Sequence, residues 1–533
     1  MTAATEYTTT DRHTADLSRI ARGGSANLIG AATGALLTLV VTWLITNGAE
    51  QSVAGSLFAA TSVFLISGAV AEHGSDVSLA KFLPPLVDRH NLADRRLGDA
   101  VAVTRIALAI TAFAGLAAGG LLAALRGPVA RLVAGPGTHP DLELGILVLA
   151  AGIPVAAVMN AALSATRGLG TVRPSVVTDK VGRGILQVVA ITAAVLAGAG
   201  MAGLTVAWAL PYAAGCAAAI AWLAVLLRRA GGHRSPGRAR RAELIREYAS
   251  YTWPRAVARV AQSVVQRADI VLVAALRSPA EAAVYTVATR FLVIGQLGTQ
   301  AIQQVVAPQI SGLLAADDRT RAKRVFQIAT AWNMALNWPL FLTFLGTAPL
   351  LLGLFGGPGF RSGDRVVVIL SVAALAAAAG GSVDILLLMA GRSGLSLVNS
   401  LVALAVNLTV NLLLIPPYGI TGAAVAWAAA IAVRNLLGMF QVRRSVGWLP
   451  FSRAAAVITV LAGLSFAVPS LALRAAGDPS PGIATAVVAA AVAVYVALLW
   501  RFRVVLGLDA FTSLLPRRAG RLTAAPGGPD GAT

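Results

Sequence analysis

The sequence predicts an all-α protein that crosses a membrane many times. Hydrophobic residues make up 57% of the 533 residues and charged residues only 12%, whereas soluble domains carry about twice that charged fraction. A helix needs roughly 20 apolar residues to span a bilayer, and segments of that kind recur along the whole chain. They lie at 26–46, 53–71, 99–125, 143–166, 174–199, 202–227, 248–276, 279–313, 326–347, 366–390, 396–415, 419–441, 454–475 and 482–500. We therefore expect about fourteen transmembrane helices.

The positions of the basic residues predict how the helices are oriented. The net charge is +20, and Lys and Arg concentrate in alternate loops, above all in 228–246, 319–324 and 501–521. By the positive-inside rule these loops face the cytoplasm, so we expect a plasma-membrane protein with both termini in the cytoplasm. The cluster at 228–246 is interpreted as a topology signal that also contacts anionic membrane lipids, not as a nucleic-acid site.

An internal repeat predicts how the helices are grouped. The sequence Gly-Leu-Thr-Val-Ala-Trp-Ala at 203–209 matches Gly-Ala-Ala-Val-Ala-Trp-Ala at 422–428, and other matches share this offset. An offset of six helices preserves orientation, so the repeat is parallel, with two six-helix lobes and two C-terminal helices. The predicted divisions are a cytoplasmic tail (1–22), a first lobe (23–230), a basic cytoplasmic linker (231–247), a second lobe (248–445), helices 13 and 14 (446–500) and a basic, then disordered, cytoplasmic tail (501–533).

Polar residues follow one stripe of the predicted helix 248–276. At about 100° per residue a single arc contains six of them, namely Thr252, Arg255, Arg259, Gln262, Gln266 and Asp269. The helix 279–313 has a similar polar stripe, which consists of Tyr285, Thr289, Gln296, Gln300 and Gln303. An Arg at the bilayer centre costs on the order of 3 kcal/mol or more, so the stripe should face protein or water. We expect it to form one wall of a hydrophilic cavity.

Two motifs resemble a known family. The first is Arg267-Ala268-Asp269 followed by an apolar run and then Tyr285; the second leads from Asn407 and Asn411 to Pro-Pro-Tyr-Gly-Ile-Thr-Gly-Ala-Ala at 416–424. Over about 22–500 the chain resembles the polysaccharide-unit flippases of the multidrug/oligosaccharidyl-lipid/polysaccharide (MOP) exporter superfamily.

The resemblance implies two six-helix lobes in a V shape that open alternately to either face. It implies a transporter that moves a polyprenyl-diphosphate-linked oligosaccharide across the plasma membrane for cell-surface polysaccharide synthesis. A polysaccharide polymerase and glycosyltransferases are the protein partners that it suggests. Lipid II flippases and drug/cation antiporters share the fold, and both remain alternatives.

Cationic side chains are the candidates for the diphosphate. Guanidinium groups bind phosphate oxygens through two donors and stay protonated, which suits Arg255 and Arg259. Lys180 and Arg183 share a predicted face with Gln187 in the fifth span; they could bind the substrate or reach the membrane surface with their charged ends. The amides of Gln262, Gln266 and Gln300 could bind sugar hydroxyls or hold helices together.

Asp269 and Asp384 are the membrane-embedded carboxylates that could couple transport to an ion. Asp269 could instead pair with Arg267 or cap its helix, and Asp179 is interpreted as an ion-pair partner of Lys180. The sequence predicts no enzyme and no cofactor, because the histidines are scattered and form no catalytic or metal-ligand pattern. A membrane polymerase or ligase is the rival from another class, but it would need a large external loop with catalytic residues.

Overall fold

The computed structural model describes residues 27–87, 94–230, 237–381, 383–477, 480–504 and 506, and they are overwhelmingly helical. Helices suit a membrane because each one satisfies its own backbone hydrogen bonds away from water. Ten of the described helices are long and apolar enough to cross a bilayer. The predicted all-α polytopic fold is confirmed, while the count of fourteen spans stays a prediction. The predicted N-terminal tail, 1–22, and residues 507–533 of the predicted C-terminal tail, 501–533, lie outside the described residues.

The first group of helices, here called the first bundle, covers the N-terminal part of the chain. Its members are the helix Asn27–Gly48, α2 (Gln51–Glu72), α3 (Ser75–Phe82), α4 (Pro84–Val87), α5 (Asp94–Ala124), α6 (Arg126–Ala134), α7 (Pro140–Gly168), the π-helical turn η2 (Ser175–Arg183), α8 (Gly184–Leu196) and α9 (Met201–Ala230). α7 is its centre, because it packs against α2, α5 and α9.

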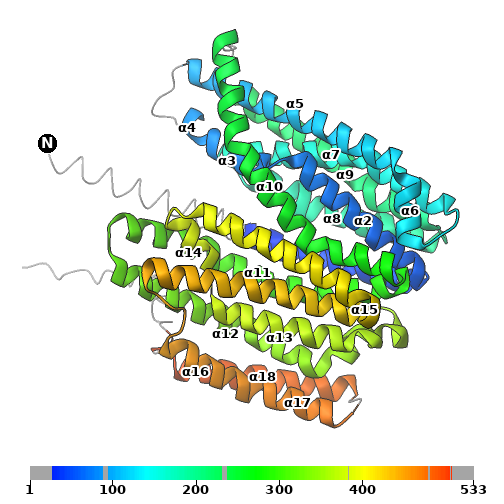
Figure 1. Cartoon of the computed structure of the whole chain (residues 1–533), viewed down its shortest axis with the longest axis vertical. Helices are drawn as coiled ribbons and strands as arrows, with labels where there is room; N and C mark the ends of the chain where they lie inside the picture. The colour runs from blue at the N-terminus through cyan, green and yellow to red at the C-terminus, as the bar shows by residue number, and fades with distance from the viewer. Residues whose placement is uncertain are drawn as a thin grey trace, which may run out of the picture.

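The second bundle follows α10 (Arg238–Leu276). It consists of α11 (Pro279–Ala315), α12 (Arg319–Gly353), η3 (Gly357–Gly363), α13 (Asp364–Gly380), α14 (Val383–Met389) and α15 (Ser393–Val446). The chain ends with α16 (Arg453–Ala462), η4 (Gly463–Ala467), α17 (Val468–Ala475) and α18 (Pro481–Arg501), which pack on α12. Figure 1 shows the first bundle above, the second below it and α16–α18 at the bottom.

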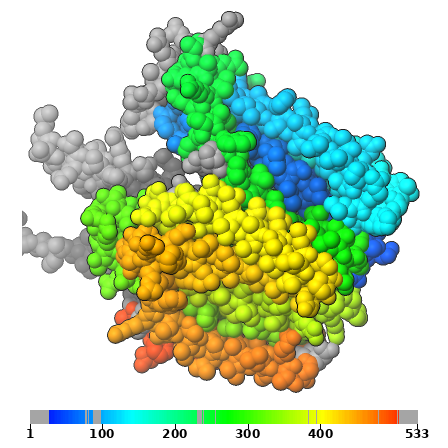
Figure 2. Space-filling view, viewed as in Figure 1, coloured from blue at the N-terminus to red at the C-terminus, as the bar shows by residue number. Residues whose placement is uncertain are grey.

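α10 connects the two bundles. Its N-terminal part contacts α3 and α5, and the helix also packs along α2 and α15. In Figure 1 it descends from the first bundle to the second, and in Figure 2 its N-terminal end projects from the top of the molecule. Residues 238–247, predicted as part of a linker, belong to this continuous helix. The repeat and the predicted domain boundaries stay predictions.

Several helices begin at capping residues that the sequence supplies. The side chains of Ser278, Asp318, Ser452 and Ser480 each accept a hydrogen bond from a backbone N–H in the following turn. Pro279 stands at the first position of α11, where its missing N–H costs nothing. The predicted break between the helices at 248–276 and 279–313 is therefore built by a Ser-Pro cap.

α15 unites two predicted spans, 396–415 and 419–441, in one helical run with a kink at Gly419. The φ angle of Gly419 is +54°, a left-handed conformation that glycine tolerates best. Pro416 and Pro417 precede it, and Arg277 donates a hydrogen bond to the carbonyl of Pro416 at 3.2 Å. In a regular helix the carbonyl of Pro416 would accept from the N–H four residues later, so the Arg277 bond satisfies a carbonyl next to the kink at Gly419.

The bundles meet at the end of the molecule where α10 turns into α11. Gln51 donates a hydrogen bond to the carbonyl of Ala280 (3.1 Å), and Asn47 donates one to the carbonyl of Leu354 (3.3 Å). A Cβ added at Gly55 would lie 1.6 Å from the carbonyl oxygen of Pro279. Only glycine permits this approach of α2 to α11, so the contact is tight.

Candidate functional site

The polar stripe of α10 and α11 lines a pocket in the second bundle. The pocket has a volume of about 330 Å³ and is walled by α10 to α15. Its glutamines are the predicted ones: Gln262, Gln266, Gln296, Gln300 and Gln303. The side chains of Gln262, Gln266, Gln296 and Gln300 are exposed and form no hydrogen bond to any residue that the structure describes. Their amides can therefore donate to and accept from a ligand.

Hydrogen-bonded amide side chains that are buried on α12 form part of the pocket wall. Asn333 and Asn337 of α12 are 4% and 2% exposed. Thr299 donates to Oδ1 of Asn333 (2.8 Å), and Asn337 donates to the same oxygen (2.9 Å). Asn333 in turn donates to the carbonyl of Ala378 (3.3 Å). These side chains satisfy one another, so they shape the pocket wall and hold α11, α12 and α13 together.

An ion pair forms another part of the pocket wall. Arg434 of α15 donates through Nη2 to Oδ2 of Asp384 on α14. Within the described part of the chain, Oδ1 of Asp384 and Nε of Arg434 have no hydrogen-bond partner. The sequence pattern indicates Asp384 but not Arg434, because only the fold brings residues 384 and 434 together.

Arg259 lies on the same stripe as the pocket glutamines. Gln262 and Gln266 follow it by three and seven residues, which places all three on one side of α10. Its side chain is exposed. It makes no ion pair or hydrogen bond with the residues that the structure describes. Arg255 belongs to α10 as predicted, but its side chain lies outside the description.

Lys180 and Arg183 have partners inside the first bundle. Lys180 donates to Oδ1 of Asn27 at 2.7 Å. Arg183 pairs with Asp179 at 2.7 Å and donates to Oε1 of Gln187 at 2.9 Å.

The predicted common face holds for Arg183 and Gln187, which are hydrogen-bonded to each other, but Lys180 does not share it. Lys180 contacts the helix Asn27–Gly48. Arg183 and Gln187 contact α9, through the Tyr212 ring at 4.6 Å and the Trp208 carbonyl at 2.9 Å. The π-helical turn at 175–183 changes the angle per residue that the prediction assumed. The predicted pairing of Asp179 with Lys180 also gives way to the hydrogen-bonded pair with Arg183.

Asp269 is almost fully buried, at 2% exposed. Its Oδ2 accepts a hydrogen bond from the hydroxyl of Tyr285 at 2.6 Å, and its Oδ1 accepts one from the backbone N–H of Ile270 at 2.9 Å. The pair joins α10 to α11. The sequence suggests that Asp269 could pair with Arg267 or cap its helix. It does not indicate Tyr285 as the hydrogen-bond partner.

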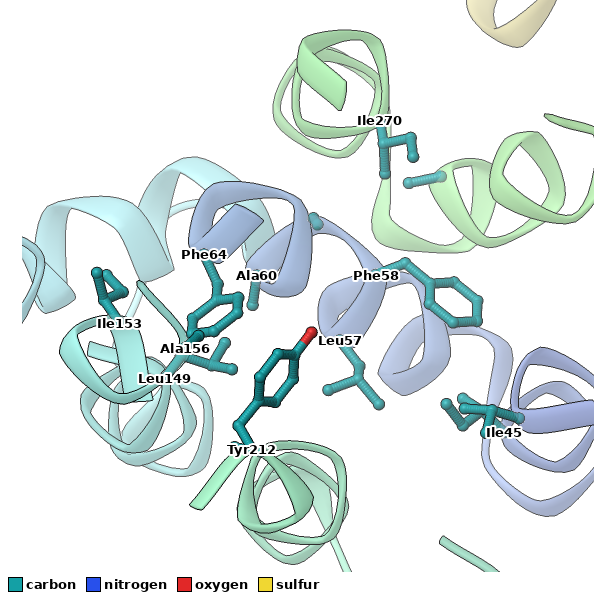
Figure 3. Packing of buried hydrophobic residues seen from close by; sticks show 14 of the residues in the cluster. Ile45, Leu57, Phe58, Ala60, Phe64, Leu149, Ile153, Ala156, Tyr212 and Ile270 are labelled. Carbon is teal, nitrogen blue, oxygen red and sulfur yellow. The ribbon is translucent and has the colours of Figure 1, made fainter. Parts of the chain in front are cut away.

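Arg267 belongs to the first motif and Arg290 lies five residues after Tyr285 on α11; neither is among the predicted site residues. Arg267 lies within electrostatic reach of Tyr212 on α9 and of Arg290 on α11. Nε of Arg290 has no hydrogen-bond partner among the described residues. Figure 3 shows the Tyr212 hydroxyl directed toward α2, among Leu57, Ala60 and Phe64. These two cations thus lie where α10 and α11 meet the first bundle. The sequence feature that indicates them is an Arg residue within a predicted transmembrane helix.

The described residues contain no group of three or more His, Cys, Asp or Glu that could hold a metal ion. Cys216 is buried in α9.

Comparisons with known proteins agree with this architecture. Residues 102–361 match a family described as "Polysaccharide biosynthesis protein". A 169-residue segment is 25% identical to the "Probable low-salt glycan biosynthesis flippase Agl15" of Haloferax volcanii; the match covers 32% of this chain and 36% of that relative. The chain thus spans about a third of the curated relative that it matches.

Two solved structures show the fold. A lipid II flippase MurJ in an inward closed conformation has a TM-score of 0.68 at 12% identity, over 90% of this chain and 98% of that one. An inward-facing multidrug resistance MATE family transporter of the MOP superfamily has a TM-score of 0.61 at 16% identity, over 78% of this chain and 94% of that one. Together with the family match, they confirm the resemblance drawn from the sequence.

Proposed function

We propose that this multi-pass membrane protein, which has the fold of MOP superfamily transporters, flips a polyprenyl-diphosphate-linked oligosaccharide across the plasma membrane for cell-surface polysaccharide synthesis. The family match at 102–361 supports a role in polysaccharide biosynthesis. The name of the Haloferax volcanii relative supports a flippase of glycan precursors. The two-bundle fold supports alternating access, since the bundles can rock against each other around a site between them.

The observation that carries the proposal is the set of arginines on α10 and α11. Arg259 is exposed and makes no ion pair with the residues that the structure describes. Arg267 and Arg290 lie within electrostatic reach of each other, with the carboxylate of Asp269 near Arg267. An anion would be attracted to this group of arginines. A diphosphate that is esterified at both ends carries one negative charge on each phosphate, and its oxygens have the geometry that guanidinium groups bind. We assign Arg259 and Arg255 to the diphosphate, with Arg267 and Arg290 as additional cations.

The same arginines weigh against a drug/cation antiporter, because they would repel a cationic drug. A lipid II flippase would use the same diphosphate chemistry, and the polysaccharide-biosynthesis match favours a glycan substrate over lipid II. A membrane polymerase or ligase would need catalytic side chains at the membrane surface. The proposal needs neither catalysis nor a cofactor; a polymerase and glycosyltransferases would act before or after the transport step.

Asp384 is the better candidate for coupling to a proton or sodium ion. It lines the pocket and its side chain is 25% exposed, whereas Asp269 is 2% exposed and both of its oxygens accept hydrogen bonds. A coupling carboxylate must exchange its ion with water. Asp384 therefore fits that role. Arg434 is the cation that pairs with its carboxylate when no coupling ion is bound.

The proposal is tested by reconstituting the full chain in liposomes with a polyprenyl-diphosphate-linked sugar in one leaflet. The expected result is protein-dependent appearance of the sugar in the opposite leaflet, measured by a sugar oxidase or lectin added outside. Transport of a cationic dye, or of lipid II in preference to the glycan lipid, would support the corresponding alternative. Absence of all lipid transport would refute the flippase assignment.

The orientation is tested separately by cysteine labelling. The basic loops predict residues 228–247 in the cytoplasm and 348–365 outside. Cysteines are introduced at Gly232 or Gly357 in a Cys216→Ala background and treated on intact cells with a membrane-impermeant thiol reagent. Only the cysteine at 357 should react. Reaction at 232 alone would reverse the orientation.

A further inference from the structure

We propose that the second-bundle pocket binds an uncharged sugar residue of the substrate, separately from the arginines that bind its diphosphate. This inference rests on the proposed function. It adds that one part of the site binds the diphosphate and another part binds the sugar. The pocket volume of about 330 Å³ lies at the lower end of the range for small-molecule sites. It suits a mono- or disaccharide rather than a whole oligosaccharide.

Free amides are the first argument. Gln262, Gln266, Gln296 and Gln300 line the pocket and are exposed. Within the described part of the chain they form no hydrogen bonds. Each amide presents both donors and an acceptor, which matches a hydroxyl group that also donates and accepts. A phosphate, which only accepts at neutral pH, would leave the amide oxygens unpaired.

The charge of the pocket is the second argument. Its lining contains one described cation, Arg434, and one described anion, Asp384, and the two pair with each other. The lining is therefore close to neutral. Nε of Arg434 and Oδ1 of Asp384 have no hydrogen-bond partner among the described residues. Both atoms are buried, so they do not contact a ligand directly. An uncharged sugar leaves the ion pair intact, whereas an added net charge in the ligand would disturb it.

Apolar surface beside the amides is the third argument. Trp427 lines the same pocket and is partly exposed, while Phe341, at 4% exposed, is buried in the wall behind it. A sugar ring has one face rich in C–H groups, which packs favourably on an aromatic surface. Amides for the hydroxyls and an aromatic ring for the C–H face are together the chemistry that a sugar requires.

The position of Arg259 links the pocket to the diphosphate. Arg259, Gln262 and Gln266 follow one another on α10, and at 1.5 Å per residue Gln266 lies about 10 Å from Arg259 along the helix axis. A diphosphate at Arg259 thus places the attached sugar beside Gln262 and Gln266. The order of groups along the helix matches the order of groups in a lipid-diphosphate-linked sugar.

Binding measurements on the purified full-length protein test the subsite. The probes are a polyprenyl diphosphate and the same lipid carrying one N-acetylhexosamine. In the variant Gln262→Leu/Gln296→Leu, affinity for the glycosylated lipid should fall about ten-fold, since two neutral hydrogen bonds are lost, while affinity for the bare lipid should stay unchanged. Gln304→Leu is the matched control, because Gln304 is exposed on α11 but does not line the pocket.

The pattern of losses separates this inference from the proposed function. If the wild type binds neither lipid, both proposals fail. If the double variant weakens both by the same factor, or weakens neither, the lipid assignment stands and the sugar subsite is refuted. Arg259→Gln should weaken both probes, in contrast to the glutamine variant.

A second measurement tests the charge argument. We expect the wild type to bind the lipid that carries a hexuronic acid several-fold more weakly than the one that carries the N-acetylhexosamine. Asp384→Asn frees Arg434 and should reverse that preference. A preference for the uronic acid in the wild type, or an unchanged preference in Asp384→Asn, would contradict an uncharged ligand beside the ion pair.

Discussion

Two cations of the first bundle have surroundings opposite to those of two cations on α10 and α11, whereas Arg434 of the second bundle is paired with Asp384. In the first bundle, Lys180 and Arg183 have close partners on neighbouring helices and along their own. In the second bundle and on α10, Arg259 is exposed and the Nε of Arg290 has no hydrogen-bond partner among the described residues. A paired cation gains little from a phosphate, because it must first give up its own partner. The difference indicates that α10 and α11 provide the charge for the substrate, while the first-bundle cations maintain the structure.

The largest effect is expected from separating the bundles without changing any charge. In Gly55→Ala, the added methyl group overlaps the carbonyl of Pro279, so α2 and α11 must move apart. Flipping in liposomes should fall by more than about ten-fold, because alternating access needs closure at this end, whereas lipid binding to α10 and α11 should persist.

Gly68→Ala is the control for this change. Gly68 lies on the same helix, and its added Cβ would meet no atom within 4 Å. Flipping by that variant should match the wild type. Loss of lipid binding in Gly55→Ala would contradict the view that α10 and α11 suffice for binding.

The next effect concerns Arg259. Arg259→Ala should lower affinity for a polyprenyl-diphosphate sugar about ten- to hundred-fold, because a charge-assisted contact contributes roughly 1.5–3 kcal/mol. Arg259→Lys should recover only part of the loss, since lysine keeps the charge but not the paired donors. The readouts are equilibrium binding and melting temperature.

Arg246→Ala is the matched control, because Arg246 is exposed on another face of α10. Both alanine variants should melt like the wild type. If the folded Arg255→Ala/Arg259→Ala protein binds the polyprenyl-diphosphate sugar with undiminished affinity, the assignment of the diphosphate site to these two arginines is refuted.

A smaller effect is expected from the carboxylates. Asp384→Asn should abolish the dependence of flipping on an imposed proton or sodium gradient and leave the gradient-independent rate within a few-fold of the wild type. Asp269→Asn should instead keep the gradient dependence and lower the melting temperature, because it weakens the contact with Tyr285. If both variants keep full gradient dependence, coupling lies elsewhere or is absent.

The smallest change in affinity is expected for Arg183. Arg183→Ala removes a partly exposed ion pair and a hydrogen bond to Gln187, which should cost about 1–2 kcal/mol of stability. Affinity for the lipid should stay within about two-fold of the wild type. Arg173→Ala, at an exposed arginine just before η2, controls for loss of charge alone. A large drop in affinity for the lipid with an unchanged melting temperature would show that Arg183 binds the substrate and does not only maintain the structure.

The sequence predicted what depends on local pattern. Helical segments follow from apolar length, and the pocket glutamines follow from their common stripe on α10 and α11. The pairing of Asp384 with Arg434 could not be predicted, because it joins residues 50 positions apart through the packing of α14 on α15. The separate environments of Lys180 and Arg183 were missed because a π-helical turn replaces the regular spacing there. The approach of Arg267 to Tyr212 depends on how the two bundles dock.

The course of α10 between the two bundles has a mechanical consequence. The helix has 39 residues and is therefore about 58 Å long at 1.5 Å per residue. It is fixed to the first bundle by a buried hydrogen bond from Thr252 to Ser78 at 2.7 Å. Pro254 lies inside α10, two residues beyond Thr252, and a proline in a helix interior removes one backbone hydrogen bond and allows the helix to bend. The residues from 255 to 276 form a segment about 33 Å long at 1.5 Å per residue. A movement of the first bundle can therefore change the angle between this arginine-bearing segment and the part of α10 that is fixed at Thr252.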